Sequence, residues 1–518
     1  MSLLTWRGAI IDRESPRLAA ILASPWITLL LVGVAIAQQL AGHIDCDVSW
    51  FITFAEKVVD GAVPYVDVTD PNPPAAFLSL IPAVTLARAL GVAVEPVVAS
   101  LVFIAAFLSI GVCALIFRAG ARRSREDWGL LLNSAVFLLL VAPEAVFAER
   151  EHVALLALAP MLATLAVRAD GGRVAAPLRL LAGLGAGVAV CFKPFFLLAF
   201  ILPAAALAFR ERSVRLLFST ETIAAATLSV LYGVGTLLFF PAYAEYALPV
   251  IADVYQPARD SWLRIAVLSV APFNFAALLS LAIASARGFA HPPAAPRFVA
   301  PNAALVCAVA SVGCLLGFFI QGKGWPNHAY PGLVLALLAW CFFALDPHPR
   351  ARDAREGRLF KFVFLPLFIA APVSFGAINQ LANAEEHPGL RAEIARVSPA
   401  HPRVIALARQ LDFGHPLTRQ LDGTWVGRPN ALWTSAFAGH LLRNAPDEAA
   451  RARLEDYRRR DLAGFAADVR EGRPDVIIVE DQGTRERVAR LPETAGVLDG
   501  YEKTAQAEEI EIWTRKAR

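Results

Sequence analysis

The chain has 518 residues, of which 57% are hydrophobic and only 18% are charged. With a mean hydropathy of +0.52, this composition excludes an ordinary soluble protein, whose surface would carry far more charge, and makes lipid the solvent for most of the chain. The net charge of +3 points to no particular partner, and we expect no nucleic-acid binding.

The N-terminus carries Arg7, Arg13 and Arg17 before a long apolar run, and no small-residue cleavage site follows. This pattern predicts a first membrane anchor rather than a removed signal peptide. Crossing about 30 Å of hydrocarbon takes about 20 apolar residues. Eleven segments approach this length, at 20–41, 95–117, 127–143, 152–168, 178–193, 195–210, 216–240, 264–286, 300–320, 330–346 and 359–378. The stretch 178–210 can also be interpreted as one long broken helix.

The distribution of arginine and lysine predicts the orientation. With the N-terminus inside, the cytoplasmic segments hold 20 Lys and Arg residues, and the short external loops hold 7. Such an excess marks the cytoplasmic side. We therefore expect a multi-pass plasma (inner) membrane protein with a cytoplasmic N-terminus and an external or periplasmic C-terminal domain.

The first external loop, 43–94, is unusually long and contains two helix-like pieces, 47–60 and 74–90, separated by prolines. The second piece is apolar, but a span there would reverse every later loop. We therefore expect both pieces to be interfacial helices.

The C-terminal stretch has an ordinary soluble composition, with strand-like runs at 403–408, 475–480 and 509–514 and a polar helix at about 446–470. This alternation predicts a small α/β domain. The expected fold is thus a mostly α membrane helix bundle over 1–379, followed by an extracytoplasmic α/β domain over 380–518.

Two carboxylates, Asp45 and Asp47, stand at the outer end of the first span, just before an amphipathic helix. They fit a solvated helix N-cap, since Asp favours that position. They also fit a general base or a metal ligand at the membrane–water interface. The i, i+2 spacing leaves open whether a divalent metal takes part, and no other cofactor is indicated.

Other polar side chains gather on the same predicted external face. Arg150 and His152 open the fourth span and fit either an ion-paired helix start or a ligand contact. Lys193, next to Pro194, fits either a lysine that reaches toward the interface or a phosphate contact. Lys323 and His328 lie in a polar loop that an ordinary turn would also explain. Gly183, Gly185 and Gly187 lie inside a span, where small residues let helices pack closely, so they do not indicate a nucleotide loop.

The loop sequence itself resembles a known family. Gly61-Ala62-Val63-Pro64-Tyr65-Val66-Asp67 is followed by Asp70-Pro71-Asn72-Pro73-Pro74 and an apolar helix. Together with the acidic end of the first span, this resembles the first external loop of GT-C glycosyltransferases. It looks most like the branch of protein mannosyltransferases, lipid A aminoarabinose transferases and lipopolysaccharide-core transferases, with Asn72 where lysine is usual.

This resemblance implies a GT-C-like bundle and a glycosyltransferase, for hexosyl or pentosyl groups, acting on a polyprenyl-phosphate-linked sugar donor. The acceptor would be an envelope glycan, lipid or protein, with membrane lipid as surroundings. Asp47 aligns with the family's base, with Asp45 second. The candidate substrate-binding residues are Tyr65, Asp67, Asp70, Asn72, Arg150, His152, Lys193, Arg259, Lys323 and His328.

Two other functions are weighed against this one. A transporter or flippase of a lipid-linked or anionic solute is the main alternative, and a scaffold or polymer-ligating protein is the third. Transporters often have repeated halves and charges near the bilayer midplane. The absence of a repeat in the sequence and the gathering of charge at one face favour the transferase. The 43–94 loop would either roof its site or dock the C-terminal domain.

Overall fold

The computed structural model describes residues 20–42, 44–118, 125–267, 271–289, 301–345 and 387–516. The chain forms two compact units. The first comprises Met1–Gly42, Ala99–Tyr232 and Asp260–Ala382, and the second comprises His43–Val98, Gly233–Arg259 and Asn383–Arg518. The first external loop thus belongs to the same unit as the C-terminal segment, and the domain boundary at 380 stays a prediction.

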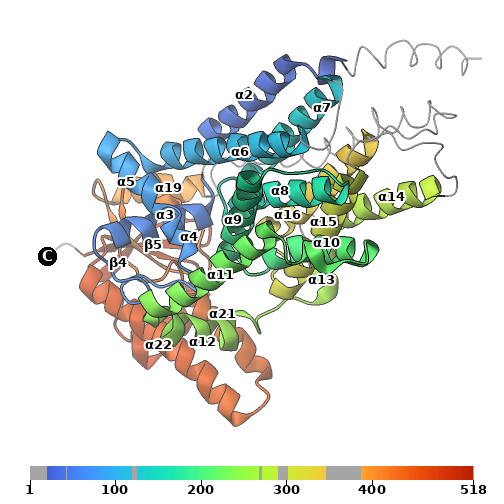
Figure 1. Ribbon diagram of the computed structural model, residues 1–518. Coiled ribbons are helices and arrows are strands. Elements are labelled where there is room, and N and C mark those ends of the chain that lie inside the picture. The colour runs from blue at the N-terminus through green and yellow to red at the C-terminus, as the bar shows by residue number, and fades with distance from the viewer. Residues whose placement is uncertain are drawn as a thin grey trace, which may run out of the picture. The chain divides into compact units, whose positions relative to one another are not determined.

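The first unit is a bundle of helices (Figure 1). Its helices, two of which continue into the other unit, are α2 (Pro25–Ala41), α6 (Val94–Arg118), α7 (Arg125–Val136), α8 (Arg150–Ala169), α9 (Ala176–Phe192), α10 (Phe196–Arg210), α11 (Thr220–Phe239), α13 (Trp262–Val267), α14 (Ala271–Phe289), α15 (Pro301–Gln321) and α16 (Pro326–Ala344). α15 packs against α8, α10 and α16, and α8 packs against α9.

Glycines bring α9 close to its neighbours. A Cβ atom on Gly183 would lie 2.2 Å from the main-chain oxygen of Glu221 in α11, and one on Gly185 would lie 2.3 Å from that of Ala157 in α8. No side chain fits at such distances. The prediction that these glycines serve helix packing is confirmed.

The predicted count of eleven spans needs correction. Among the described residues four helices are long and apolar enough to cross a membrane: Val94–Arg118, Arg150–Ala169, Thr220–Phe239 and Asn302–Gln321. The count rises to five if α2 and α3 (Cys46–Val59) form one bent span. Several predicted spans are apolar but too short as helices: α9 and α10 have 17 and 15 residues, and α7 passes into a π turn at Phe137–Val141. The candidate at 359–378 lies outside the described residues.

The two ends of this bundle differ in their charged side chains. At one end, Arg168 at the end of α8 and Arg179 near the start of α9 both bind Glu221 at the start of α11. At the other end, Lys193, which follows α9, contacts three side chains. These are Glu151 at the start of α8, Gln321 at the end of α15 and His328 at the start of α16. Consecutive helices therefore run in opposite directions, as alternating spans require.

The second unit contains the helices of the first external loop: α3, α4 (Ala75–Leu78) and α5 (Ile81–Leu90). The predicted helices at 47–60 and 74–90 are confirmed as helices, the second broken at Ser79–Leu80; their place at a membrane surface stays a prediction. The other helices of this unit are α12 (Leu248–Val250), α19 (Pro388–Val397), α20 (Leu417–Gln420), α21 (Trp433–Leu441), α22 (Glu448–Gly472) and α23 (Gln482–Ala489).

A five-stranded mixed sheet forms the centre of the C-terminal segment, in the order β2-β1-β3-β5-β4. The strands are β1 (Arg403–Leu407), β2 (Thr424–Trp425), β3 (Val476–Val479), β4 (Tyr501–Ala507) and β5 (Ile510–Arg515). β1 pairs in parallel with β2 and β3, while β5 is antiparallel to β3 and β4. The three predicted strands and the long helix are confirmed. Two strands were not predicted: β2, which has two residues, and β4, which is mostly polar and exposed.

Candidate functional site

Lys193 stands at the break between α9 and α10. Pro194 disfavours a helical conformation for the preceding residue, and Lys193 accordingly has extended angles of φ −148° and ψ 122°. The break turns the side chain into the bundle, where it is only 8% exposed. The sequence therefore ends one helix at this lysine and buries its ammonium group.

Three side chains from three other helices surround this ammonium. Its Nζ donates to Glu151 Oε1, contacts His328 Nε2 at 2.9 Å and donates to Gln321 Oε1 at 3.3 Å. Glu151 lies in the first turn of α8, where the helix dipole favours a carboxylate. These groups line a small cavity of about 20 Å³, enough for roughly one water molecule.

Further charged residues adjoin this cluster. Arg150 and Lys323 are buried and close enough to act electrostatically on His328. The Oε2 atom of Glu149 accepts a hydrogen bond of 2.7 Å from Asn327 Nδ2. Three cations thus face two carboxylates among the described residues of this cluster. The excess positive charge suits an anionic ligand.

His152 is placed differently from its neighbours. It is fully buried, its Nε2 is 2.8 Å from the main-chain oxygen of Leu139, and its Nδ1 accepts from the N–H of Ala148 at 3.2 Å. Both ring nitrogens are therefore engaged by main chain, which is typical of a structural histidine. Its role as a ligand contact stays a prediction.

In the second unit, the acidic pair occupies the start of α3. Asp45 is the N-cap, and its Oδ1 accepts a hydrogen bond of 2.7 Å from the main-chain N–H of Asp47. This confirms the N-cap interpretation for Asp45. Asp47 lies in the first turn, half-buried, with the remainder of the helix packed behind it.

The proline-rich turn is built around Asp70. Its carboxylate is 5% exposed and accepts hydrogen bonds from Trp50 Nε1 (2.8 Å) and from the main-chain and side-chain nitrogens of Asn72 (2.7 and 2.8 Å). The hydroxyl of Tyr65 donates to the main-chain oxygen of Asn72 at 2.8 Å. Asp67 is exposed and accepts from the N–H of Val63. Tyr65, Asp70 and Asn72 therefore form one small network.

The loop also contacts the C-terminal segment of the same unit. Arg419 pairs with Glu56 at 2.5 Å and with Glu95 at 2.6 Å. The ammonium of Lys57 donates a hydrogen bond of 2.6 Å to the main-chain oxygen of Gly427. The main-chain N–H of Thr69 donates one of 3.0 Å to the main-chain oxygen of Arg428. These contacts are what the docking interpretation of the loop requires.

Arg259 lies apart from these networks within its unit. Its side chain is exposed, and its Nε donates to the main-chain oxygen of Gln256 at 3.1 Å. Sequence reasoning missed Glu151 and Gln321 as partners of Lys193 and missed Arg419. A carboxylate at a helix start beside Arg150 was the available signal for Glu151.

Among the described residues, no group of three or more His, Cys, Asp or Glu side chains is placed to hold a metal ion.

No family model and no curated protein sequence matches the chain. Solved structures do match, and two of them do so over nearly the whole chain. One is ArnT from Cupriavidus metallidurans bound to undecaprenyl phosphate, with a TM-score of 0.58, 12% identity, and 95% of this chain and 98% of that chain covered. The other is ArnT from the same organism in the apo state, with a TM-score of 0.55, 14% identity and the same coverage.

The chain has the ArnT fold. The resemblance to GT-C transferases predicted from the first external loop is thus confirmed at the level of the fold.

Proposed function

We propose that this protein is a membrane glycosyltransferase that moves a sugar from a polyprenyl-phosphate donor to an envelope glycan, lipid or protein acceptor on the external face. The observation that carries the proposal is the likeness in fold, over 95% of the chain, to an ArnT structure bound to undecaprenyl phosphate. A shared fold does not fix the chemistry, so the proposal also needs residues with suitable roles.

The buried Lys193 cluster suits the leaving group. Transfer of the sugar leaves a lipid phosphate that gains negative charge, and preorganised cations and N–H donors stabilise such charge. Lys193, Arg150 and Lys323 supply three cations against Glu149 and Glu151. The contact of Lys193 with Gln321 is the longest of its three, at 3.3 Å. A phosphate oxygen would replace that contact most easily.

Asp47 suits the role of general base. The attacking hydroxyl of the acceptor must lose its proton, and a positioned carboxylate can take it. Asp45 is committed to the cap of α3, whereas Asp47 stands two residues further along, in the first turn. We therefore assign the base to Asp47 and the orientation of its helix to Asp45.

The donor role is tested with undecaprenyl phosphate itself as the probe. Native mass spectrometry of the full-length protein should show binding, at least tenfold weaker in Lys193→Ala/Glu151→Gln. The double variant removes both partners, because Lys193→Ala alone would leave a buried carboxylate without its cation. Asp47→Asn should bind the probe as the wild type does. Equal binding by the double variant would contradict the phosphate role.

The transferase role is tested in cells by mass spectrometry of envelope glycans and lipids. Asp47→Asn should reduce the sugar-bearing product by a factor of 10² or more, because general base catalysis contributes about that much. The control is Asp60→Asn, which removes an exposed carboxylate at the end of the same helix. Undiminished product in Asp47→Asn would overturn the base. Undecaprenyl phosphate binding without any sugar-bearing product would favour the transporter.

A further inference from the structure

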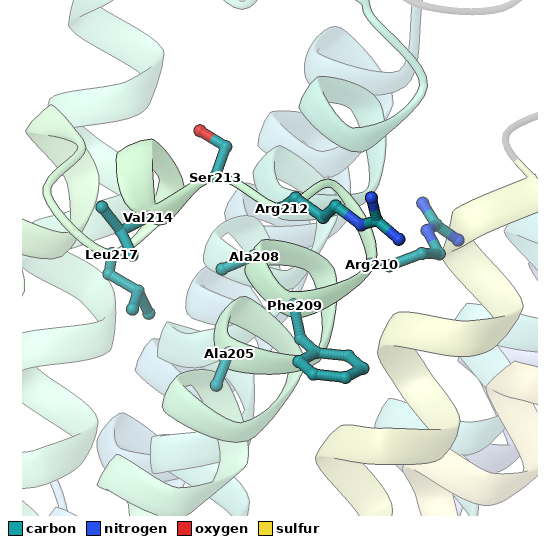
Figure 2. Close-up of a pocket in the computed structure, with 8 residues that line it drawn as sticks. All are labelled: Ala205, Ala208, Phe209, Arg210, Arg212, Ser213, Val214 and Leu217. Atoms are coloured by element: carbon teal, nitrogen blue, oxygen red, sulfur yellow. The ribbon is translucent and has the colours of Figure 1, made fainter.

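An open cavity of about 640 Å³ lies at the turn after α10. It is lined by Ala205, Ala208, Phe209, Arg210, Arg212, Ser213, Val214 and Leu217. Figure 2 shows the guanidinium groups of Arg210 and Arg212 on the same side of the turn, with the ring of Phe209 below them. The cavity therefore combines two cations with an apolar wall.

The turn holds these arginines in defined positions. The main-chain N–H of Ser213 donates a hydrogen bond of 2.9 Å to the main-chain oxygen of Ala208. The main-chain N–H of Arg212 donates one of 3.2 Å to the main-chain oxygen of Phe209. This is the Schellman pattern, and Arg212 takes the left-handed position with φ 51°. A left-handed arginine is uncommon, because glycine is the residue that adopts this conformation without strain.

Within the described part of the chain, neither guanidinium has an acidic partner. Arg210 and Arg212 are exposed, and the adjacent Glu211 makes no ion pair with either. Two apolar side chains of the lining are also largely exposed: Phe209 is 87% exposed and Val214 is 62% exposed. Water solvates the two guanidinium groups well but the exposed apolar side chains poorly. At a membrane surface, acyl chains would cover the apolar side chains, and lipid phosphates would pair with the guanidinium groups.

We propose that this cavity binds the phosphodiester headgroup of an anionic glycerophospholipid. Arg210 and Arg212 would hold the phosphate through their paired N–H groups, Ser213 would offer a hydroxyl, and the acyl chains would lie along Phe209 and Val214. These exposed apolar side chains favour a lipid over a soluble anion.

The cavity is separate from the Lys193 cluster. α10 starts three residues after Lys193 and ends at Arg210, so its 15 residues place the two sites at opposite ends of one helix, about 22 Å apart at 1.5 Å per residue. The lipid bound here is therefore a different molecule from the proposed donor, and the inference does not depend on the proposed function.

The test is a titration of the full-length protein with phosphatidylglycerol and with phosphatidylcholine, followed by native mass spectrometry. The wild type should retain phosphatidylglycerol preferentially. R210Q/R212Q should bind it about 30-fold more weakly, since each basic residue near an anionic surface contributes about 1 kcal/mol and 1.4 kcal/mol is tenfold. R118Q/R173Q is the matched control, because it removes two exposed arginines that do not line the cavity.

Two further variants keep the test decisive. If R210Q/R212Q does not purify, Arg212→Gly removes one guanidinium and suits the left-handed turn, and it should still weaken binding several-fold. R210K/R212K should bind at an intermediate level, because lysine keeps the charge but not the bidentate geometry. Unchanged phosphatidylglycerol binding in R210Q/R212Q would overturn the proposal. Displacement of the bound phosphatidylglycerol by inorganic phosphate would also overturn it. The same holds if R210Q/R212Q loses undecaprenyl phosphate binding as strongly as it loses phosphatidylglycerol binding.

Discussion

His415 is fully buried between two indole rings, with ring centroids 5.3 Å from Trp50 and 4.8 Å from Trp425. Neither of its ring nitrogens has a hydrogen-bond partner among the described residues. Burial, with a smaller contribution from the nearby cations Lys57 and Arg419, lowers the pKa of His415 to about 3. The imidazole is therefore neutral in the folded protein and packs as an uncharged ring between Trp50 of α3 and Trp425 of the C-terminal sheet.

This environment predicts a pH-dependent stability. Between pH 6.5 and about 3 the unfolded chain binds a proton at His415 and the folded chain does not, so stability falls as pH falls through this range. His415→Phe should remove this component, and it should raise the thermal unfolding temperature more at pH 5 than at pH 8. The measurement is tryptophan fluorescence of the full-length protein on heating. His440→Phe, at an exposed position, is the control, and an equal effect at both pH values would contradict the account.

At the scale of elements, the packing of α9 against α11 depends on a missing side chain. Gly183→Ala would put a Cβ atom 2.2 Å from the main-chain oxygen of Glu221, and main chain cannot move aside as a side chain can. The two helices must separate, which would weaken the ion pairs of Glu221 with Arg168 and Arg179 at the same crossing.

We therefore expect Gly183→Ala to destabilise the protein by about 1–3 kcal/mol, the usual range for overpacking. The measurement is the thermal unfolding temperature in detergent. Gly111→Ala in α6 is the matched control, because nothing lies within 4 Å of its added Cβ atom. That variant should be neutral or slightly stabilising, since alanine favours a helix more than glycine does. Equal effects of the two substitutions would contradict the packing role.

The docking of the first external loop depends on another single residue. Arg419, whose side chain is 15% exposed, is shared by Glu56 of α3 and Glu95 of α6. Arg419→Ala would leave two partly buried carboxylates without their common cation, and losing one partner of a buried pair costs several kcal/mol. Limited proteolysis should then release the C-terminal segment faster than in the wild type.

The control for Arg419→Ala is Arg396→Ala. Arg396 also pairs with a glutamate, Glu393, but its side chain is 62% exposed. Exposed pairs contribute about 0–1 kcal/mol, so this variant should be digested at the wild-type rate. If Arg419→Ala is no more sensitive than Arg396→Ala, the loop is held by other contacts.

At the scale of the whole molecule, the orientation in the membrane follows from the two ends of the first unit. Arg168 and Arg179 meet at one end, and Lys193 and Glu151 meet at the other. The excess of arginine predicts that the first of these ends is cytoplasmic. The exposed Arg173 and the 40% exposed Trp325 mark the two ends for labelling.

In a Cys46→Ser background, a membrane-impermeant thiol reagent on intact cells should label Trp325→Cys and not Arg173→Cys. A tag after Arg518 should be accessible from outside. The reverse labelling pattern would place the Lys193 cluster in the cytoplasm and contradict the proposed external site.

Sequence alone determined where the helices are, because lipid requires long apolar segments and hydropathy records them directly. It also determined the α/β character of the C-terminal segment, since β1 and β3 are short apolar runs, β5 carries strand-forming residues, and a polar helical stretch precedes β3. Hydropathy does not record where a helix stops, which is why eleven spans were predicted. The break at Lys193-Pro194 and the π turn after α7 shorten the helices without lowering their hydropathy.

Only the tertiary structure decided which polar side chains act together. Glu151, Lys193, Gln321 and His328 come from four helices, and their meeting depends on how those helices cross. The resemblance singled out Lys193 and His328 one at a time but could not pair them. It ranked Asp47 before Asp45 as the base, but it left open which of the two caps α3, a role that the structure gives to Asp45. Burial and partners set the role of a charged group, and both are properties of the folded chain.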